Sequence, residues 1–279
     1  MTLLVVGEAL VDIVTRADGT VLERPGGSPL NVAVGLGRLG HQVQLLAALG
    51  DDEHGRLVRD HVEASHVELL AAPLARTATA DARLDESGSA TYVFDLAWDL
   101  TGAPEHDEPQ WLHVGSIATT LQPGADQVAA LVTSYEGSVS FDPNCRPLIM
   151  GSPDLGRVEA LVAASEVVKL SDEDSAWLSP EETDLELAQR WLALGPALVV
   201  VTRGPLGALA VTGEGVREIP LAAGDPVVDT VGAGDSFMAG LISGLVDGLH
   251  VDDALDLAAR TSRITCSRVG ADPPWKDDL

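Results

Sequence analysis

Positive charge is scarce in this sequence. Its 279 residues include 17 lysines and arginines against 43 aspartates and glutamates, which gives a formal net charge of −26 at pH 7. Proteins that bind nucleic acids or anionic membranes depend on clustered lysine and arginine. The composition therefore argues against both as partners, and an anionic ligand must be met by a few local groups. Only two lysines occur, Lys169 and Lys276, so each is noticeable.

Cysteines are few and long apolar runs are missing. Cys145 and Cys266 are too few for a disulfide scaffold and lack metal-ligand spacing, so we expect buried free thiols. No predominantly apolar run approaches the roughly 20 residues that cross a bilayer. The first residues lack the basic segment of a signal peptide. These features predict a cytoplasmic protein.

Three common nucleotide-binding patterns are also missing. The sequence contains no G-x-x-x-x-G-K-[ST] and no protein-kinase motif set, and the glycine after the first strand is not part of a G-x-G-x-x-G. P-loop enzymes, protein kinases and nicotinamide-dependent enzymes are therefore unsupported.

What the sequence does contain is a regular alternation of strands and helices. Strands are predicted at residues 3–14 with an interruption at Gly7, 42–49, 111–117, 138–141, 167–170, 197–201, 209–212 and 215–219. Helices are predicted at residues 31–39, 56–64, 126–135, 155–164, 185–194, 238–245 and 251–265. This alternation predicts an α/β fold with a mostly parallel sheet.

Residues 77–100 break that alternation. Residues 77–84 and 90–96 alternate with the period of strands around a turn at residues 85–88, which predicts a hairpin. With residues 13–24 it would form a small sheet outside the main domain. Trp98 belongs either to the core of this sheet or to a ligand-facing platform, and aromatic burial, the commoner use, favours the core.

Residues 229–237 read Asp-Thr-Val-Gly-Ala-Gly-Asp-Ser-Phe and precede an apolar helical run. Because Gly232, Ala233 and Gly234 are small, the first N–H groups of that helix would be unobstructed at the positive end of its dipole. Such a terminus binds anions. Asp235 could simply cap the helix, or it could accept a proton from a hydroxyl. Phosphoryl transfer needs that base together with donors for negative charge.

Other polar residues follow predicted strands, where ligands of parallel sheets gather. Asp12 follows the first strand and could cap a turn there. In residues 25–40, Gly26 and Gly27 allow close backbone approach, and Asn31 begins a helix. Residues 142–147, Asp-Pro-Asn-Cys-Arg-Pro, place Asp142, Asn144 and Arg146 at the same edge, although Arg146 could pair with a surface carboxylate instead.

These stretches together resemble the ribokinase (PfkB) family of sugar kinases. Residues 25–40 are similar to its first signature, G-G-x-x-x-N-x-A-x-x-x-x-x-L-G, and residues 229–237 to its second. The segments L-H-V-G-S, D-P-N-x-R-P and V-K-L-S-D-E resemble the fructokinase-like branch. The resemblance implies one ribokinase-like domain over residues 1–279, a three-layer sandwich with a β lid formed by residues 13–24 and 77–100.

The resemblance also assigns expected roles to individual residues. Asp235 would be the catalytic base and residues 232–234 the anion hole. The expected sugar-side residues are Asp12, Gly26, Gly27, Asn31, Asn144, Arg146 and Asp235. The expected nucleotide-side residues are Lys169, Thr202, Arg203, Gly204, Gly207, Gly232 and Gly234.

Two kinds of cation are implied. The family's Asn-x-x-Glu, whose acid organises Mg²⁺ through water, is replaced here by Ser171 and Asp174, so Glu173 competes with Asp174 for this role. A K⁺ ion could lie between Asp229, the carbonyl of Val231 and the loop around Gly270.

The implied activity is transfer of the γ-phosphate of ATP to the exocyclic hydroxymethyl of a monosaccharide, with fructose as the leading candidate. Ribose, 2-keto-3-deoxygluconate and nucleosides are alternative substrates. A sugar or nucleotide sensor on the same fold is the non-enzyme alternative, but it would be expected to lose Asp235 or the anion hole. A homodimer could form through the lid.

Overall fold

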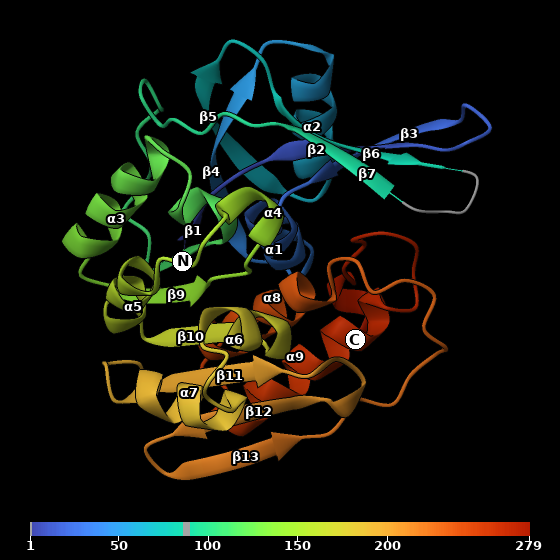
Figure 1. Cartoon of the computed structure of the whole chain (residues 1–279). Coiled ribbons are helices and arrows are strands. Elements are labelled where there is room, and N and C mark those ends of the chain that lie inside the picture. Colours follow the sequence, from blue (N-terminus) through green and yellow to red (C-terminus); the bar gives the residue numbers. More distant parts are fainter. Residues whose placement is uncertain (1, 86–89) are drawn as a thin grey trace.

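Two sheets organise the protein in the computed structural model, which describes residues 2–85 and 90–279 (Figure 1). The larger sheet has nine strands in the order β13-β12-β11-β10-β9-β8-β1-β4-β5. These are β1 (Thr2–Val6), β4 (Gln42–Gly50), β5 (Val67–Leu74), β8 (Trp111–Gly115), β9 (Ser138–Asp142), β10 (Val167–Ser171), β11 (Leu198–Thr202), β12 (Ala208–Thr212) and β13 (Gly215–Ile219). Neighbouring strands from β5 to β11 are parallel, whereas β12 and β13 pair antiparallel. The prediction of a mostly parallel sheet is confirmed.

Helices cover both faces of this sheet because successive side chains of each strand point to opposite faces. On β1, Leu3 and Val5 enter one hydrophobic core, and Leu4 and Val6 enter the other. The first core holds α1 (Ser28–Arg38), α2 (Glu53–Ala64), α8 (Ala233–Val246) and α9 (Val251–Thr265). The second holds α3 (Gly124–Ser134), α5 (Leu155–Ala163), α6 (Asp172–Leu178) and α7 (Asp184–Leu192). The expected three layers are therefore present.

The smaller sheet, which the sequence analysis expects to be a lid, projects from the main body (Figure 1). Its strands are ordered β3 (Val21–Gly26), β2 (Leu10–Thr15), β6 (Ala78–Leu84) and β7 (Ala90–Asp95). It thus spans residues 10–26 and 78–95, close to the predicted 13–24 and 77–100. Most of the turn expected at residues 85–88 lies outside the described residues.

Trp98 follows the lid and belongs to the main body. Its side chain is buried in the second core, and its indole N–H donates to the carbonyl oxygen of Ala118 at 3.0 Å. The preference for a core role is confirmed, but the core is that of the sandwich and not that of the lid.

Several local features differ from the expectations. The strand β5 and the helix α6 had not been predicted. Helix α1 begins at Ser28 rather than Asn31, with Pro29 in its first turn, where a proline needs no hydrogen-bonded N–H. Cys145 is buried as expected, whereas Cys266 is only half-buried. None of the helices in residues 2–85 and 90–279 combines the length and hydrophobicity that a bilayer crossing requires.

Helix α8 is held very close to its neighbours by glycines. A Cβ on Gly35 of α1 would lie 2.7 Å from Cβ of Ala239. A Cβ on Gly240 would lie 2.3 Å from Oγ1 of Thr261 and 2.9 Å from Cα of Ala258, both on α9. These approaches fix the position of the α8 N-terminus relative to α1 and α9.

We expect Gly240→Ala to destabilise the protein, because the added methyl group cannot fit between α8 and α9. Overpacking of this kind typically costs about 1–3 kcal/mol. Gly156→Ala is the matched control, since the nearest atom to a Cβ there, Oδ1 of Asp154, is 3.6 Å away. That control should be neutral or slightly stabilising, because alanine favours helix more than glycine does. Equal denaturation midpoints for the two variants would contradict close packing at Gly240.

Candidate functional site

The N-terminus of α8 has the open geometry that its sequence predicts. Gly232 precedes the helix with φ of 75°, a left-handed conformation that glycine adopts without strain. A Cβ on Gly232 would also lie 2.6 Å from Cβ of Ala271. Glycine is therefore required here on two grounds. Ala233 and Gly234 then open the helix, and neither side chain is large enough to cover its first N–H groups.

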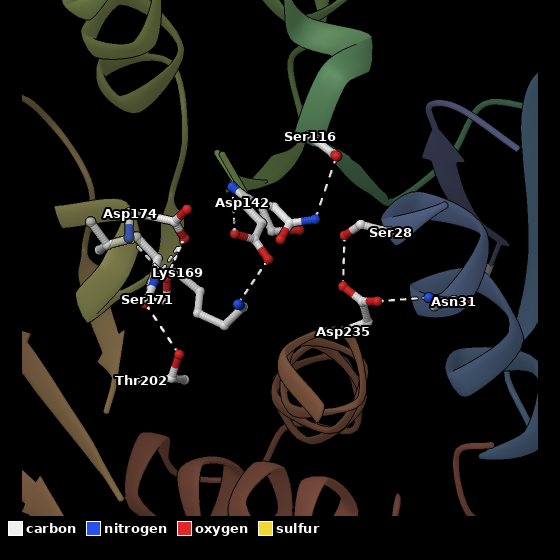
Figure 2. A network of polar contacts seen from close by, with 12 residues as sticks. Ser28, Asn31, Ser116, Asp142, Lys169, Ser171, Asp174, Thr202 and Asp235 are labelled. Carbon is white, nitrogen blue, oxygen red and sulfur yellow. Dashed lines mark hydrogen bonds and ion pairs between the residues drawn. The ribbon is translucent and has the colours of Figure 1, made fainter. Parts of the chain in front are cut away.

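Asp235 lies in the first turn of α8 and faces α1 (Figure 2). Its Oδ1 accepts a hydrogen bond from the hydroxyl of Ser28 at 2.7 Å, and its Oδ2 accepts one from the amide of Asn31 at 2.8 Å. Both carboxylate oxygens are thus bound by side chains of another helix. This orientation differs from that of a simple cap, whose carboxylate accepts backbone N–H groups of its own helix.

A buried ion pair lies on the other side of the helix terminus (Figure 2). The ammonium nitrogen of Lys169 is 2.8 Å from Oδ2 of Asp142, and both side chains are buried. A Cβ on Gly234 would lie 3.3 Å from the same nitrogen, so the ammonium stands beside the first turn of α8.

The charges around Lys169 keep it protonated. Burial acts to lower the pKa of Lys169, but the carboxylates of Asp142, Asp174 and Asp235 outweigh it and raise that pKa. Burial raises the pKa of Asp142 to about 6, with Lys169 opposing the rise. The terminus of α8 therefore combines the helix dipole with one fixed positive charge, as an anion site in a very acidic protein requires.

Comparison with known proteins identifies the family. Residues 2–278 match the family described as pfkB family carbohydrate kinase. The chain belongs to this family. It is accordingly an ATP-dependent carbohydrate kinase, as its two signatures predicted.

Individual relatives agree with this PfkB-family assignment. A fructokinase of Klebsiella pneumoniae is 34% identical over 302 residues, which cover 99% of this chain and 97% of that protein. The crystal structure of aminoimidazole riboside kinase from Salmonella enterica, complexed with aminoimidazole riboside and an ATP analog, matches with a TM-score of 0.86 and 26% identity over 100% of this chain and 98% of that chain. A fructokinase double mutant from Vibrio cholerae, bound to fructose, ADP and potassium ion, matches with a TM-score of 0.83 and 30% identity. The match covers 97% of this chain and 93% of that chain. The predicted ribokinase-like fold is confirmed.

The residues expected on the sugar side of this PfkB-family kinase lie around the ends of β2, β3 and β9. A Cβ on Gly26 would lie 2.1 Å from Oδ2 of Asp12, so this glycine leaves room for the carboxylate. Gly27 has φ of 109°, and a Cβ there would lie 2.4 Å from the carbonyl oxygen of Glu8. The amide of Asn144 donates to the hydroxyl of Ser116 at 3.4 Å. The guanidinium of Arg146 is not paired with any carboxylate in the described residues, but donates to the carbonyl oxygen of Cys145 at 2.9 Å.

The residues expected on the nucleotide side follow β11. The hydroxyl of Thr202 donates to the carbonyl oxygen of Leu170 at 3.4 Å. A Cβ on Gly207 would lie 2.1 Å from the carbonyl oxygen of Ile219, and both Gly204 and Gly207 have positive φ. Arg203 is engaged elsewhere, because its guanidinium pairs with Asp184 at 2.6 Å and with Glu218 at 3.2 Å. The structure therefore does not bring Arg203 to the ion pair of Lys169 and Asp142. The role of Arg203 in nucleotide binding stays a prediction.

The two candidate acids for Mg²⁺ differ in their surroundings. Asp174 is buried, and its oxygens accept bonds from the N–H of Cys145 at 2.7 Å and from the N–H and hydroxyl of Ser171 at 2.9 and 2.7 Å. It therefore forms a capping box for α6. Glu173 is exposed in the first turn of that helix. The described residues contain no cluster of three or more His, Cys, Asp or Glu side chains arranged to hold a metal ion.

The loop expected to hold a monovalent cation is closed by Asp229. Its carboxylate accepts hydrogen bonds from the N–H of Val231 at 3.1 Å and from the N–H of Gly270 at 2.8 Å. These bonds lower the pKa of Asp229. A Cβ on Gly270 would lie 2.5 Å from Nη1 of Arg24, so a guanidinium from the lid strand β3 lies against this loop. Arg268 also belongs to this part of the chain, two residues before Gly270, but its guanidinium pairs with Asp278 at 2.9 Å.

Sequence reasoning had missed Ser28, Glu8 and Ser116. Ser28 stands three residues before Asn31, so the two share one face of α1, but the helix was expected to begin only at Asn31 and no local pattern links Ser28 to Asp235. Glu8 stands four residues before Asp12 in the sequence, but nothing in the neighbouring residues indicates that its side chain is buried. Ser116 contacts the site only because β8 and β9 are adjacent in the sheet.

Proposed function

We propose that this protein transfers the γ-phosphate of ATP to the 6-hydroxymethyl group of fructose, giving fructose 6-phosphate. The observation that carries the proposal is the position of Asp235, whose carboxylate is oriented by α1 beside the open N-terminus of α8. The 34% identity to a fructokinase over nearly the whole chain supports fructose as the acceptor.

In the proposed mechanism, Asp235 accepts the proton of the sugar hydroxyl as that oxygen attacks the γ-phosphorus. Asn31 and Ser28 hold the carboxylate in position, because they donate to its two oxygens. The N–H groups of residues 232–235 stabilise the charge on the transferring group. Lys169 adds a positive charge beside the same turn, and Asp142 keeps its ammonium in place.

We further propose that Mg²⁺ accompanies the nucleotide. Such ions are bound largely by phosphates and waters, so a cage of protein ligands is not required. Asp174 or Glu173 would contact the ion through water. Glu173 is free to do so at the surface of α6, whereas Asp174 would have to share oxygens that already accept three hydrogen bonds.

A nucleoside is the second candidate acceptor. The aminoimidazole riboside kinase matches this structure over its full length with a TM-score of 0.86. Its sequence identity of 26% is lower than the 34% of the fructokinase, which is why fructose is preferred.

The exposed lid residues Tyr92, Val93 and Val21 form a candidate surface for a second copy of the chain, and this homodimer stays a prediction.

Fructose should give the highest kcat/KM in a coupled assay of ATP consumption. The panel would include fructose, ribose, 2-keto-3-deoxygluconate and aminoimidazole riboside, each with excess Mg²⁺ and, as a blank, with EDTA. Preference for another acceptor by tenfold or more would contradict the fructose assignment but leave the kinase activity intact.

Replacing Asp235 by asparagine should lower kcat by roughly 10²- to 10⁴-fold, because a positioned general base is lost. Asn retains the shape of the side chain, so sugar and ATP binding should persist in calorimetry. Asp253→Asn is the matched control, since Asp253 occupies the same third position of α9 and is exposed. A folded D235N protein that binds both ligands and keeps a few per cent or more of the wild-type kcat would refute the base assignment.

Potassium should raise the rate when it replaces a bulky organic cation at matched ionic strength. The proposed site combines the carbonyl of Val231 with the Asp229 loop, and the Vibrio cholerae relative was solved with a potassium ion. Equal rates in the two buffers would show that potassium is not needed. Arg24 would then be the candidate fixed charge, and Arg24→Gln should lower the rate in both buffers.

A further inference from the structure

Glu8 is a buried acid to which the proposed mechanism gives no part. It lies in the bend between β1 and β2, and only 6% of its surface is exposed. Carboxylates are seldom buried to this extent without a positive partner in direct contact.

Three segments of the proposed sugar site meet at Glu8. Its Oε2 accepts a hydrogen bond from the N–H of Ala118 at 3.2 Å, two residues after Ser116. The hydroxyl of Ser116 accepts a hydrogen bond from the side-chain amide of Asn144 at 3.4 Å. The carbonyl oxygen of Glu8 lies 2.4 Å from where a Cβ on Gly27 would be. Gly27 immediately precedes the helix that carries Ser28 and Asn31.

Two of these segments are held in unfavourable backbone conformations. Ser116 has φ of 56° and Asn144 has φ of 36°, and among the described non-glycine residues only His66 shares a positive φ. Such conformations persist only where the surroundings enforce them, and they concentrate at functional sites. The hydrogen bond that the N–H of Ala118 donates to Glu8 supplies part of that enforcement.

One positive charge acts on Glu8. Burial raises the pKa of Glu8 to about 7, although hydrogen bonding to its carboxylate and, least of all, the charge of Arg146 act to lower it. Arg146 also acts on Asp12 of β2. Asp142, the last residue of β9, is paired with Lys169. The first turn of α1 has no acidic residue, and residues 116–119 carry no charge.

We propose that Glu8 is a positioning residue of the sugar site, which holds the 116–118 turn so that Asn144 can contact the acceptor sugar. It is not a catalytic residue, because it acts through these neighbours. The inference rests on the proposed function only in assuming that this face binds the sugar.

Protonation of Glu8 would therefore weaken sugar binding without removing the base Asp235. If only the ionised form binds, the apparent KM rises in inverse proportion to the ionised fraction. For a group that titrates near pH 7, the sugar KM should fall roughly tenfold between pH 6 and pH 8 at saturating Mg-ATP. Direct calorimetry of sugar binding without nucleotide should show the same trend, which excludes titration of ATP as its cause.

The variant Glu8→Gln removes the titration and keeps the shape. Its sugar KM should be high and nearly independent of pH, while kcat at saturating sugar stays close to that of the wild type. Glu63→Gln is the matched control, because Glu63 is exposed on α2. It should reproduce the wild-type pH profile.

Thermal unfolding gives a readout that needs no sugar. A carboxyl with a raised pKa binds more protons when folded than when unfolded, so ionisation of Glu8 lowers stability as pH rises from about 4.5 to about 7. The midpoint of Glu8→Gln relative to wild type should therefore increase from pH 5 to pH 8. Glu63→Gln should show no such change.

A flat wild-type KM between pH 6 and pH 8 would overturn the proposal, even if Glu8→Gln fails to fold. An unchanged pH profile in a folded Glu8→Gln protein would overturn it as well. If another acceptor proves to be the substrate in the panel, the same titration is made with that acceptor. A failure of the fructose assignment is thereby kept apart from a failure of the role of Glu8.

Discussion

The junction between α1 and the N-terminus of α8 is the interaction on which the rest of the site depends. The two hydrogen bonds from Ser28 and Asn31 to Asp235 join residues more than 200 positions apart in the chain. They form because Gly35 lets α1 approach Ala239, and Gly240 lets α9 support α8 from behind. A hydroxyl and an amide orient the carboxylate without neutralising it. The two bonds thereby fix the orientation of the proposed general base.

Charge balance is the second constraint, because this acidic protein must accept an anionic nucleotide. The structure places one of its two lysines next to the helix terminus and surrounds its ammonium with carboxylates. Burying an ion pair is costly unless both partners are well bonded. The pair of Lys169 and Asp142 thus contributes little as a source of stability. Its more specific effect is to hold a positive charge at a point where the dipole of α8 is also positive.

Much of the architecture was predictable from local sequence. The alternation of apolar strands and helices indicated the parallel sheet, and the break at residues 77–100 indicated the lid. The strand β5 was missed because no Gly or Pro turn signal separates it from the helix that precedes it. The helix α6 was missed because its seven residues carry three acids, and its start depends on the capping box between Ser171 and Asp174.

The sequence by itself determined the family, the sheet type and the residues at the α8 terminus, since each depends on short-range patterns of glycine, aspartate and apolar spacing. Tertiary structure alone decided which side chains meet there. Ser28 could be seen as a partner of Asp235 only after α1 and α8 were packed, and Lys169 as a neighbour of Gly234 only after β10 was placed beside β9. Glu8 is the clearest case, because its pKa is raised by burial among segments that are distant in the chain. Those surroundings come from β1, the 116–118 turn and the segment after β9, which no local pattern connects.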